Sequence, residues 1–309
     1  MRRVVPLTLL ALMLAAPAVA ASAASLDELL ERGGEASYSA EQTINCSTPD
    51  GPRDAVVTVA QEGDEIRVGS TVSEGVEIIA GSGGWTLSRG GEVVSSASVE
   101  SGEDPVAPLY AVEEGGAAFY LGRPALTFDL LRDGAPRARL VLDSDSGAMM
   151  AATTLYADGA VYCDRRFVFF DPAAPGPAPL EPGPGGELTP VEAPETGLPE
   201  SAAGFRRLDT YEDDDGPTFA YYSDGFFSFA VFVTPVAVTL PDATEAELGG
   251  AVYRRSFTPG QVVYVWETRD GAMALVGDLP PDLHEPVLAE FPEPSEPDLI
   301  RRWWRRLFG

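Results

Sequence analysis

Apolar and polar residues alternate in short runs along most of the chain, starting at Tyr38. Alternation with a period of two places successive side chains on opposite faces of a β-strand. The runs recur at intervals of about ten residues and are separated by turn-forming residues, which predicts an antiparallel meander. The predicted strands of this first set are Tyr38–Ser47, Asp54–Glu62, Glu65–Thr71, Gly75–Ala80, Gly84–Arg89 and Glu92–Ser98.

A second set of strands follows an acidic stretch, Glu100–Gly116, which we interpret as a loop or a helical turn. Dipeptides such as Asp133-Gly134 and Asp158-Gly159 favour tight turns between the strands of this set. We therefore expect consecutive hairpins. Their strands are Ala125–Arg132, Arg137–Asp143, Ala148–Tyr156 and Val161–Phe169.

A short helix is predicted ahead of the first strand, at Ser25–Glu31. Ser25 is a good N-cap residue, and Glu28 stands where a capping box requires an acidic partner. Leu26, Leu29 and Leu30 give this helix an apolar face that can pack on the sheet.

Residues 171–198 interrupt the alternation, because proline and glycine are frequent there and bulky apolar residues are few. This composition predicts an exposed, semi-extended linker without helix or sheet. Beyond it, shorter alternating runs and a closing helix at Pro281–Phe291 predict a second, smaller antiparallel sheet. The fold class is therefore α+β and mostly antiparallel β, with folded domains at residues 25–170 and 199–291.

The stretch Tyr221–Pro235 joins a tight turn to a strand that is apolar on both faces. Ser223-Asp224-Gly225 supplies the turn, since aspartate bonds to its own backbone and glycine accepts positive φ. Alternation puts Phe227 and Phe229 on one face of the strand and Phe226 and Phe232 on the other. We expect both faces to be covered.

Residues 1–24 have the pattern of a secretory signal peptide. Arg2 and Arg3 precede the apolar run Val4–Ala16, and small residues follow at a cleavage site. An uncleaved membrane anchor is disfavoured, because the apolar run is shorter than the ~20 residues that span a bilayer. The protein is therefore predicted to be exported to the periplasm or another part of the extracytoplasmic envelope.

Export makes a disulfide between Cys46 and Cys163 feasible, because the chain has two cysteines and an oxidising compartment keeps such a bond. The alternative is two separately buried thiols on different strands. The spacing along the sequence does not decide between them.

The chain of 309 residues carries a formal net charge of −27, and all of its basic residues are arginine. Such an acidic protein repels nucleic acid, and lysine-based catalysis is excluded. His284 is the sole histidine, so a multi-histidine metal site is excluded, and we expect His284 at the surface. No nucleophile or cofactor motif is present, so we expect neither catalytic residues, metal nor cofactor, and no enzyme activity.

The C-terminal segment 292–309 is a proline-containing tether followed by an amphipathic tail. Apolar and arginine side chains fall on opposite faces of a helical projection, which is typical of a membrane-surface segment. Docking of the tail onto the acidic body or a partner, or a tail without fixed structure, are the alternatives. The tail residues are Arg301, Arg302, Trp303, Trp304, Arg305, Arg306, Leu307 and Phe308.

Motifs in both domains resemble the MucB/RseB family and cover nearly the whole mature chain. In the first domain these are Gly122-Arg123-Pro124-Ala125, Arg139-Leu140-Val141-Leu142-Asp143, Ser146-Gly147 and Leu155-Tyr156-Ala157-Asp158-Gly159. In the second they are Leu198-Pro199, Gly204-Phe205, Tyr222-Ser223-Asp224-Gly225, Val231-Phe232-Val233-Thr234-Pro235 and Val276-Gly277-Asp278-Leu279-Pro280-Pro281.

This resemblance implies a first domain shaped as an open half-barrel wrapped around helices, similar to the lipoprotein carriers LolA and LolB. It also implies a regulatory function. Proteins of this family bind the extracytoplasmic region of a membrane-anchored anti-sigma factor, shield it from proteolysis, and release it in response to a lipid signal in the envelope stress response. A lipid or lipoprotein carrier that uses the same pocket is the alternative function, and an envelope hydrolase is a third.

Two sets of binding residues follow from these considerations. Alternation favours a concave apolar face for lipid at Ile44, Val57, Val59, Ile66 and Trp85. Because the doubly apolar strand lies in the partner-binding domain of the resembled family, Phe226, Phe227, Phe229 and Phe232 are candidates for the partner interface.

Overall fold

The computed structural model describes residues 24–70, 76–81, 84–89, 92–98, 109–174, 189–190, 197–212, 218–235, 238–240, 242–269 and 271–295. Residues 1–23 of the predicted signal peptide (1–24) and residues 296–309 of the predicted tether and tail (292–309) lie outside the described residues. Within the described part of the chain, no helix is long and apolar enough to cross a bilayer.

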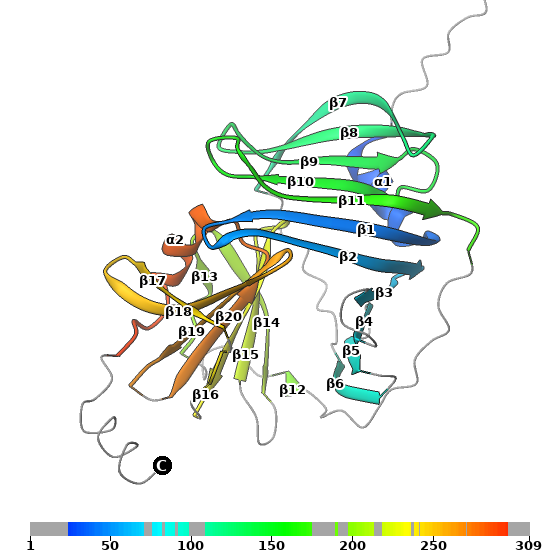
Figure 1. The fold of residues 1–309 in the computed structure, drawn as a ribbon. Helices are drawn as coiled ribbons and strands as arrows, with labels where there is room; N and C mark the ends of the chain where they lie inside the picture. Colours follow the sequence, from blue (N-terminus) through cyan, green and yellow to red (C-terminus); the bar gives the residue numbers. More distant parts are fainter. Residues whose placement is uncertain are drawn as a thin grey trace, which may run out of the picture.

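The first domain is built on an 11-stranded antiparallel sheet (Figure 1). Its strands follow the order β6-β5-β4-β3-β2-β1-β11-β10-β9-β8-β7, so the first six form one limb and the last five the other. The strands are β1 (Ser37–Thr48), β2 (Gly51–Glu62), β3 (Glu65–Ser70), β4 (Val76–Gly81), β5 (Gly84–Arg89), β6 (Glu92–Ser98), β7 (Ala111–Tyr120), β8 (Arg123–Arg132), β9 (Ala135–Asp143), β10 (Met149–Leu155) and β11 (Val161–Asp171).

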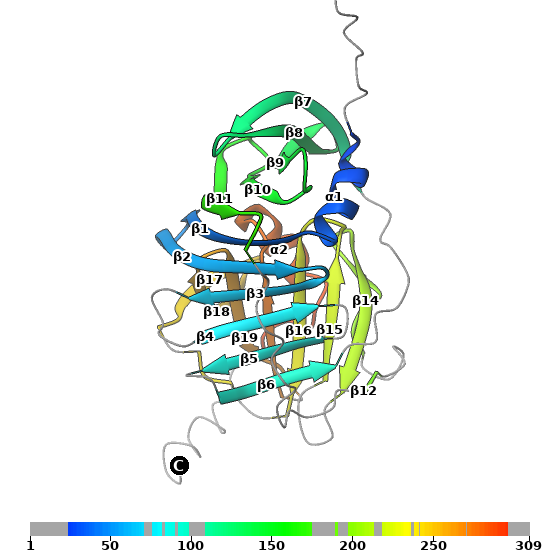
Figure 2. The same ribbon diagram turned by 90° about the vertical axis from the view of Figure 1, so that its right-hand side faces the viewer.

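Helix α1 (Leu26–Gly34) lies beside the limb formed by β7 to β11, which we call the upper limb (Figure 2). The predicted capping box is confirmed, since the Glu28 amide donates to Ser25 Oγ at 3.3 Å and the Ser25 amide donates to the Glu28 carboxylate at 3.0 Å. The helix approaches the sheet closely at Gly147, which has φ +75° and where a Cβ atom would overlap the carbonyl oxygen of Leu29. Glycine is therefore required at this contact.

The second domain is a 9-stranded antiparallel sheet closed by a short helical segment. Its strand order is β12-β14-β15-β16-β20-β19-β18-β17, with β13 also paired to β14. The elements are β12 (Thr189–Pro190), β13 (Ser201–Ala202), β14 (Phe205–Glu212), β15 (Thr218–Ser223), β16 (Ser228–Thr234), β17 (Thr244–Leu248), β18 (Ala251–Thr258), β19 (Gln261–Glu267), β20 (Ala272–Gly277), the 3₁₀ helix η2 (Pro281–Leu283) and α2 (His284–Leu288).

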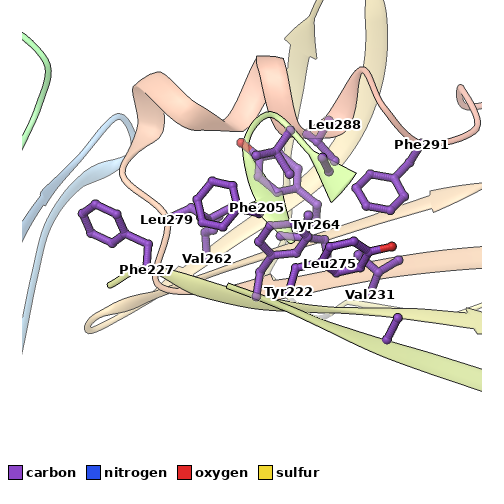
Figure 3. Close-up of a cluster of buried hydrophobic side chains, with 14 of the residues drawn as sticks. Phe205, Tyr222, Phe227, Val231, Val262, Tyr264, Leu275, Leu279, Leu288 and Phe291 are labelled. Atoms are coloured by element: carbon purple, nitrogen blue, oxygen red, sulfur yellow. The ribbon is translucent and has the colours of Figure 1, made fainter. Parts of the chain in front are cut away.

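Aromatic side chains fill the core of the second domain (Figure 3). Tyr222 stacks on Phe229 with ring centroids 4.9 Å apart, and Phe291 meets Tyr222 edge-on at 5.7 Å. The same cluster of buried apolar residues continues into the first domain, where it includes Phe128 and Leu140. The two domains thus share a continuous apolar core.

The doubly apolar strand of the sequence is β16, the central neighbour of β15 and β20. Phe229 and Val231 are fully buried on one face. On the other face Ala230 and Phe232 are half-buried, and Phe232 stacks on Phe219 at 5.2 Å. One face is therefore covered completely and the other only in part.

The predicted fold class is confirmed: the chain is mostly antiparallel β and forms two open sheets. Some local predictions were wrong. Glu100–Gly116 is not wholly a loop, because β7 begins at Ala111. His284 is not at the surface but is 1% exposed, with Nδ1 2.7 Å from the Tyr264 hydroxyl and Nε2 2.9 Å from the Leu279 carbonyl oxygen.

The linker region 171–198 is described in part. Thr189 and Pro190 pair with the end of β14, and Leu198 is buried in the core of the second domain. Residues 189–190 therefore form a short strand within the segment 171–198, for which the composition predicted neither helix nor sheet.

Cys46 and Cys163 form a disulfide, which is one of the two arrangements left open by the sequence. The cysteines face each other on β1 and β11, 117 residues apart in the chain. The bond joins the two limbs of the larger sheet at strands that also pair through their backbones.

Candidate partner-binding surfaces

The two domains meet at a seam whose most buried charged member is Asp224, in the turn between β15 and β16. Asp224 Oδ1 accepts hydrogen bonds from the amides of Phe226 and Phe227 at 3.1 and 2.8 Å. Asp224 Oδ2 accepts from the Tyr110 hydroxyl at 2.7 Å and from Arg132 Nη1 at 3.0 Å. Oδ1 therefore stabilises the turn, and Oδ2 binds side chains of the first domain.

Tyr110 remains a donor in this arrangement. Burial first, and then the neighbouring Asp224 carboxylate, raise the pKa of Tyr110 far above its ordinary value. The Tyr110 ring also meets Phe226 edge-on, with centroids 5.9 Å apart.

Further arginine contacts cross the seam. Arg137, which is 4% exposed, donates to the Asp282 carboxylate at 2.6 Å. A second ion pair has its arginine on the other domain: Arg255 of the second domain donates to the Asp50 carboxylate of the first at 2.5 Å. Arg165 Nη2 donates to a backbone carbonyl in the turn between β18 and β19 at 2.8 Å. Because these groups lose water when the domains meet, correct pairing favours one relative orientation of the domains.

The sequence analysis missed this seam, although it singled out the Ser223-Asp224-Gly225 turn. The partners of the charged pairs lie far apart in the chain, 92 residues for Arg132 and Asp224 and 205 for Asp50 and Arg255. With many carboxylates available, no local pattern shows which ones meet an arginine.

The register of the larger sheet places four of the five lipid-pocket candidates, Ile44, Val57, Val59 and Ile66, on one face, whereas the side chain of Trp85 lies outside the described part of the structure. Val59 is opposite Ala40 on β1, a strand on which Ile44 shares that face. On the next strands, Gln61 is paired with Ile66, Ile66 with Ala80, and Ala80 with position 85 on β5, so these backbone positions belong to the same face.

The surroundings of these candidates differ along the face. Val57 and Val59 pack with Tyr38 and Phe167 of the same chain, and Ile44 packs against the disulfide cluster. Ile66 is 38% exposed. Toward β3 and β4 the face is therefore open to solvent, whereas at β1 and β2 the protein's own side chains occupy it.

The phenylalanine candidates for the partner interface also divide into two groups. Phe227 and Phe229 are buried in the core of the second domain, with 0% and 1% exposure. Phe226 is half-buried at the seam against Tyr110, and Phe232 is half-buried on the less covered face of β16. In this conformation only Phe226 and Phe232 have surface that a partner could contact.

A shallow trough of about 520 Å³ lies on the opposite face of the upper limb, across β7 to β11. Its lining combines apolar residues with charged ones. The sequence analysis did not find it, because one wall is contributed by β7 in the stretch that was interpreted as a loop or helical turn.

Among the described residues, no group of three or more His, Cys, Asp or Glu side chains is placed to hold a metal ion. Burial lowers the pKa of His284 to about 4, so this imidazole is neutral near pH 7 and is enclosed in the core. The sole histidine is therefore not available at the surface to contact a ligand or partner.

No protein-family model and no curated protein sequence matches the chain. Solved structures do match it. A chain of the MucA/MucB complex of Pseudomonas aeruginosa aligns over 89% of this chain and 100% of its own length, with 19% identity and a TM-score of 0.51. The chain has the fold of MucB.

The crystal structure of MucB alone agrees, covering 86% of this chain and 96% of MucB with 20% identity and a TM-score of 0.54. MucB in complex with MucA(peri) covers 88% of this chain and 98% of its own, with 20% identity and a TM-score of 0.51. The alignment to MucB therefore includes both domains, which confirms the fold expected from the sequence resemblance.

Proposed function

We propose that the protein is an exported regulator that binds the extracytoplasmic region of a membrane-anchored anti-sigma factor and shields it from proteolysis. The observation that carries this proposal is the two-domain fold shared with MucB, a protein crystallised with MucA(peri). The sequence motifs in both domains, which resemble the MucB/RseB family, support the same class of partner. Steric protection of a cleavable segment needs surface area and affinity rather than catalytic residues.

The test is capture of the partner by the mature chain, residues 25–309, from the envelope of the cell that exports it. We expect a single-pass anti-sigma factor in the eluate. Its purified extracytoplasmic region should then be cleaved more slowly by a site-1-type protease when the mature chain is present. Repeated capture without any anti-sigma factor, or cleavage at an unchanged rate in a complex, would contradict the proposal.

A lipid signal is proposed to release the partner, and the open part of the larger sheet supports this. Ile66 and Ile78 are 38% and 45% exposed on neighbouring strands of the face that carries Val57 and Val59. A ligand that prefers the partner-free conformer shifts the population away from the complex. Addition of an acyl lipid should therefore dissociate the wild-type complex and leave an Ile66→Asp complex intact.

The carrier alternative predicts a different composition of the natural protein. Mature chain isolated from its source would then contain stoichiometric acyl lipid and no protein partner. Mass spectrometry of the native protein separates this outcome from the regulatory one.

Peripheral membrane contact through residues 301–308 is part of the same proposal. Trp and Arg in this segment fit an interface with anionic headgroups. Co-sedimentation with anionic liposomes should be lost when the chain ends at Phe291. Equal binding of the full and shortened chains would rule out docking by the tail.

A further inference from the structure

The trough on the outer face of the upper limb is built from two adjacent rows of side chains that run across the strands. The apolar row consists of Leu131 and Pro136, paired across β8 and β9, and Leu155 and Val161, paired across β10 and β11. Val161 is 51% exposed. By alternation these residues point away from the face that carries Phe128 and Leu140 into the core. The row is therefore an apolar strip on the solvent side of the sheet.

The second row is polar and lies beside the first. Glu113 pairs with Asp129, Asp129 with Arg139, and Arg139 with Thr153, from β7 to β10. Arg139 donates to both oxygens of Asp129, at 2.7 and 3.0 Å, so these two charges neutralise each other. Among the described residues, no basic side chain forms an ion pair with Glu113, which is exposed at the open end of the row. The row therefore presents one uncompensated negative charge.

We propose that this trough binds an extended peptide segment of a partner protein, with apolar side chains over the apolar row and an arginine or lysine side chain at Glu113. The identity of the partner rests on the proposed function, whereas the peptide chemistry rests on the trough alone. Charge complementarity selects the basic group, since an acidic segment would meet both Glu113 and a strongly acidic chain.

The dimensions of the trough fit such a segment. Crossing from β7 to β11 covers four inter-strand spacings, or ~19 Å, which matches an extended peptide of about six residues. At its far end the trough reaches the β10–β11 hairpin, which is itself part of the seam, because the Ala157 amide donates to Asp282 at 3.2 Å. A bound segment would therefore lie against the hairpin that contacts the second domain.

Fluorescence anisotropy with two synthetic peptides tests the proposal on the full mature chain. The probes are labelled Arg-Leu-Thr-Leu-Thr-Leu and the same peptide with Glu in place of Arg. Alternation places all three leucines on one side of the extended probe, toward the apolar row. We expect the Arg peptide to bind about tenfold more tightly than the Glu peptide, because its charge pairs with Glu113 instead of repelling it.

Two variants with matched controls locate the binding. Val161→Arg should weaken the Arg peptide about tenfold by placing a charge in the apolar row. Glu113→Lys should reverse the preference between the peptides. Val168 is a similarly exposed valine, 45% against 51% for Val161, about 20 Å along the same strand, so the Val168→Arg variant should bind the Arg peptide as the wild type does. Glu114→Lys should do the same, because Glu114 is opposite Phe128 and so lies on the other face.

Several outcomes would overturn the proposal. These are absence of binding by the wild type, equal binding of both peptides, and equal weakening by the control variants. Dimerisation of the wild type that Val161→Arg abolishes would identify a second copy as the occupant and would also contradict it.

The two proposals fail separately. If the anti-sigma factor is captured equally by wild type, Val161→Arg and Glu113→Lys, its segment does not use the trough, but the proposed function stands. If no anti-sigma factor is captured while the peptide preference follows the variants, the trough stands and the proposed function does not.

Discussion

Replacing Asp224 with asparagine removes the charge at the centre of the seam while keeping the shape of the side chain. Asparagine retains an oxygen in place of Oδ1, so the bonds from the Phe226 and Phe227 amides at 3.1 and 2.8 Å can persist. Its amide nitrogen takes the place of Oδ2, where it faces two donors, Tyr110 and Arg132. The substitution therefore separates attachment of the first domain from formation of the turn.

The expected cost follows from the burial of the group. Asp224 is fully buried, and the Arg132 side chain is 19% exposed, so Arg132 would keep its charge with little access to water. Removing one partner of a buried ion pair costs about 3–5 kcal/mol, and the partial exposure of Arg132 puts this case near about 3 kcal/mol. Tyr110→Phe alone should lower the free energy of unfolding by about 1.5 kcal/mol, because it removes a hydrogen bond to a charged acceptor.

Urea unfolding of the mature chain measures these free energies, and a double-mutant cycle isolates the coupling. Tyr110→Phe should cost less in the Asp224→Asn background than in the wild type, since its acceptor is already gone. Asp129→Asn is the matched control: it breaks a bidentate pair with Arg139, whose side chain is 62% exposed, and should cost less than about 1 kcal/mol. A cost for Asp224→Asn no larger than that of the control, or an unchanged effect of Tyr110→Phe, would refute the reasoning.

Three further predictions concern the core. His284 has a folded-state pKa of about 4, below its ordinary 6.5, so between these values the unfolded state binds more protons. The free energy of unfolding should therefore fall by about 3 kcal/mol as the pH drops from 7 to 4, and in His284→Gln this part of the pH dependence should disappear from the urea midpoints. Replacing Cys46 and Cys163 with serine should cost about 2–5 kcal/mol in calorimetry, and an unchanged Tm would contradict the structural role of the bond. Phe227→Ala should lower the free energy of unfolding by about 3–5 kcal/mol in urea unfolding, and half-buried Phe232→Ala by clearly less; equal losses would mean that the burial of these two side chains is wrongly assigned.

The local part of the fold could be read from the sequence because it depends on neighbours along the chain. The Asp133-Gly134 turn is an example, with φ values of +53° and +78° that aspartate and glycine tolerate best. The capping box at Ser25 and Glu28 is another, because both partners lie within one turn of helix. Alternation predicted most of the strands of both sheets for the same reason.

The parts that were missed depend on residues brought together by folding. β7 escaped detection because Glu113, Glu114, Gly115 and Gly116 interrupt its alternation, and as an edge strand its side chains are largely exposed. A lone polar histidine was expected at the surface, whereas His284 is buried because Tyr264 and Leu279 satisfy both ring nitrogens. Neither partner is close enough in sequence to form a recognisable pattern.

The two charged regions differ in how ionic strength should act on them, and this difference ties the seam to the trough. At the seam Asp224 and Arg137 are 0% and 4% exposed, so their contacts are shielded from mobile ions. Glu113 faces solvent, where mobile ions weaken the attraction between exposed charges, with a Debye length of about 8 Å at physiological salt. Salt therefore weakens recognition of a basic segment at the trough while the domains stay joined. Because the β10–β11 hairpin belongs to both regions, a segment bound at Val161 would lie next to the Asp282 contact, and its effect on the seam would be transmitted through packing rather than through long-range charge.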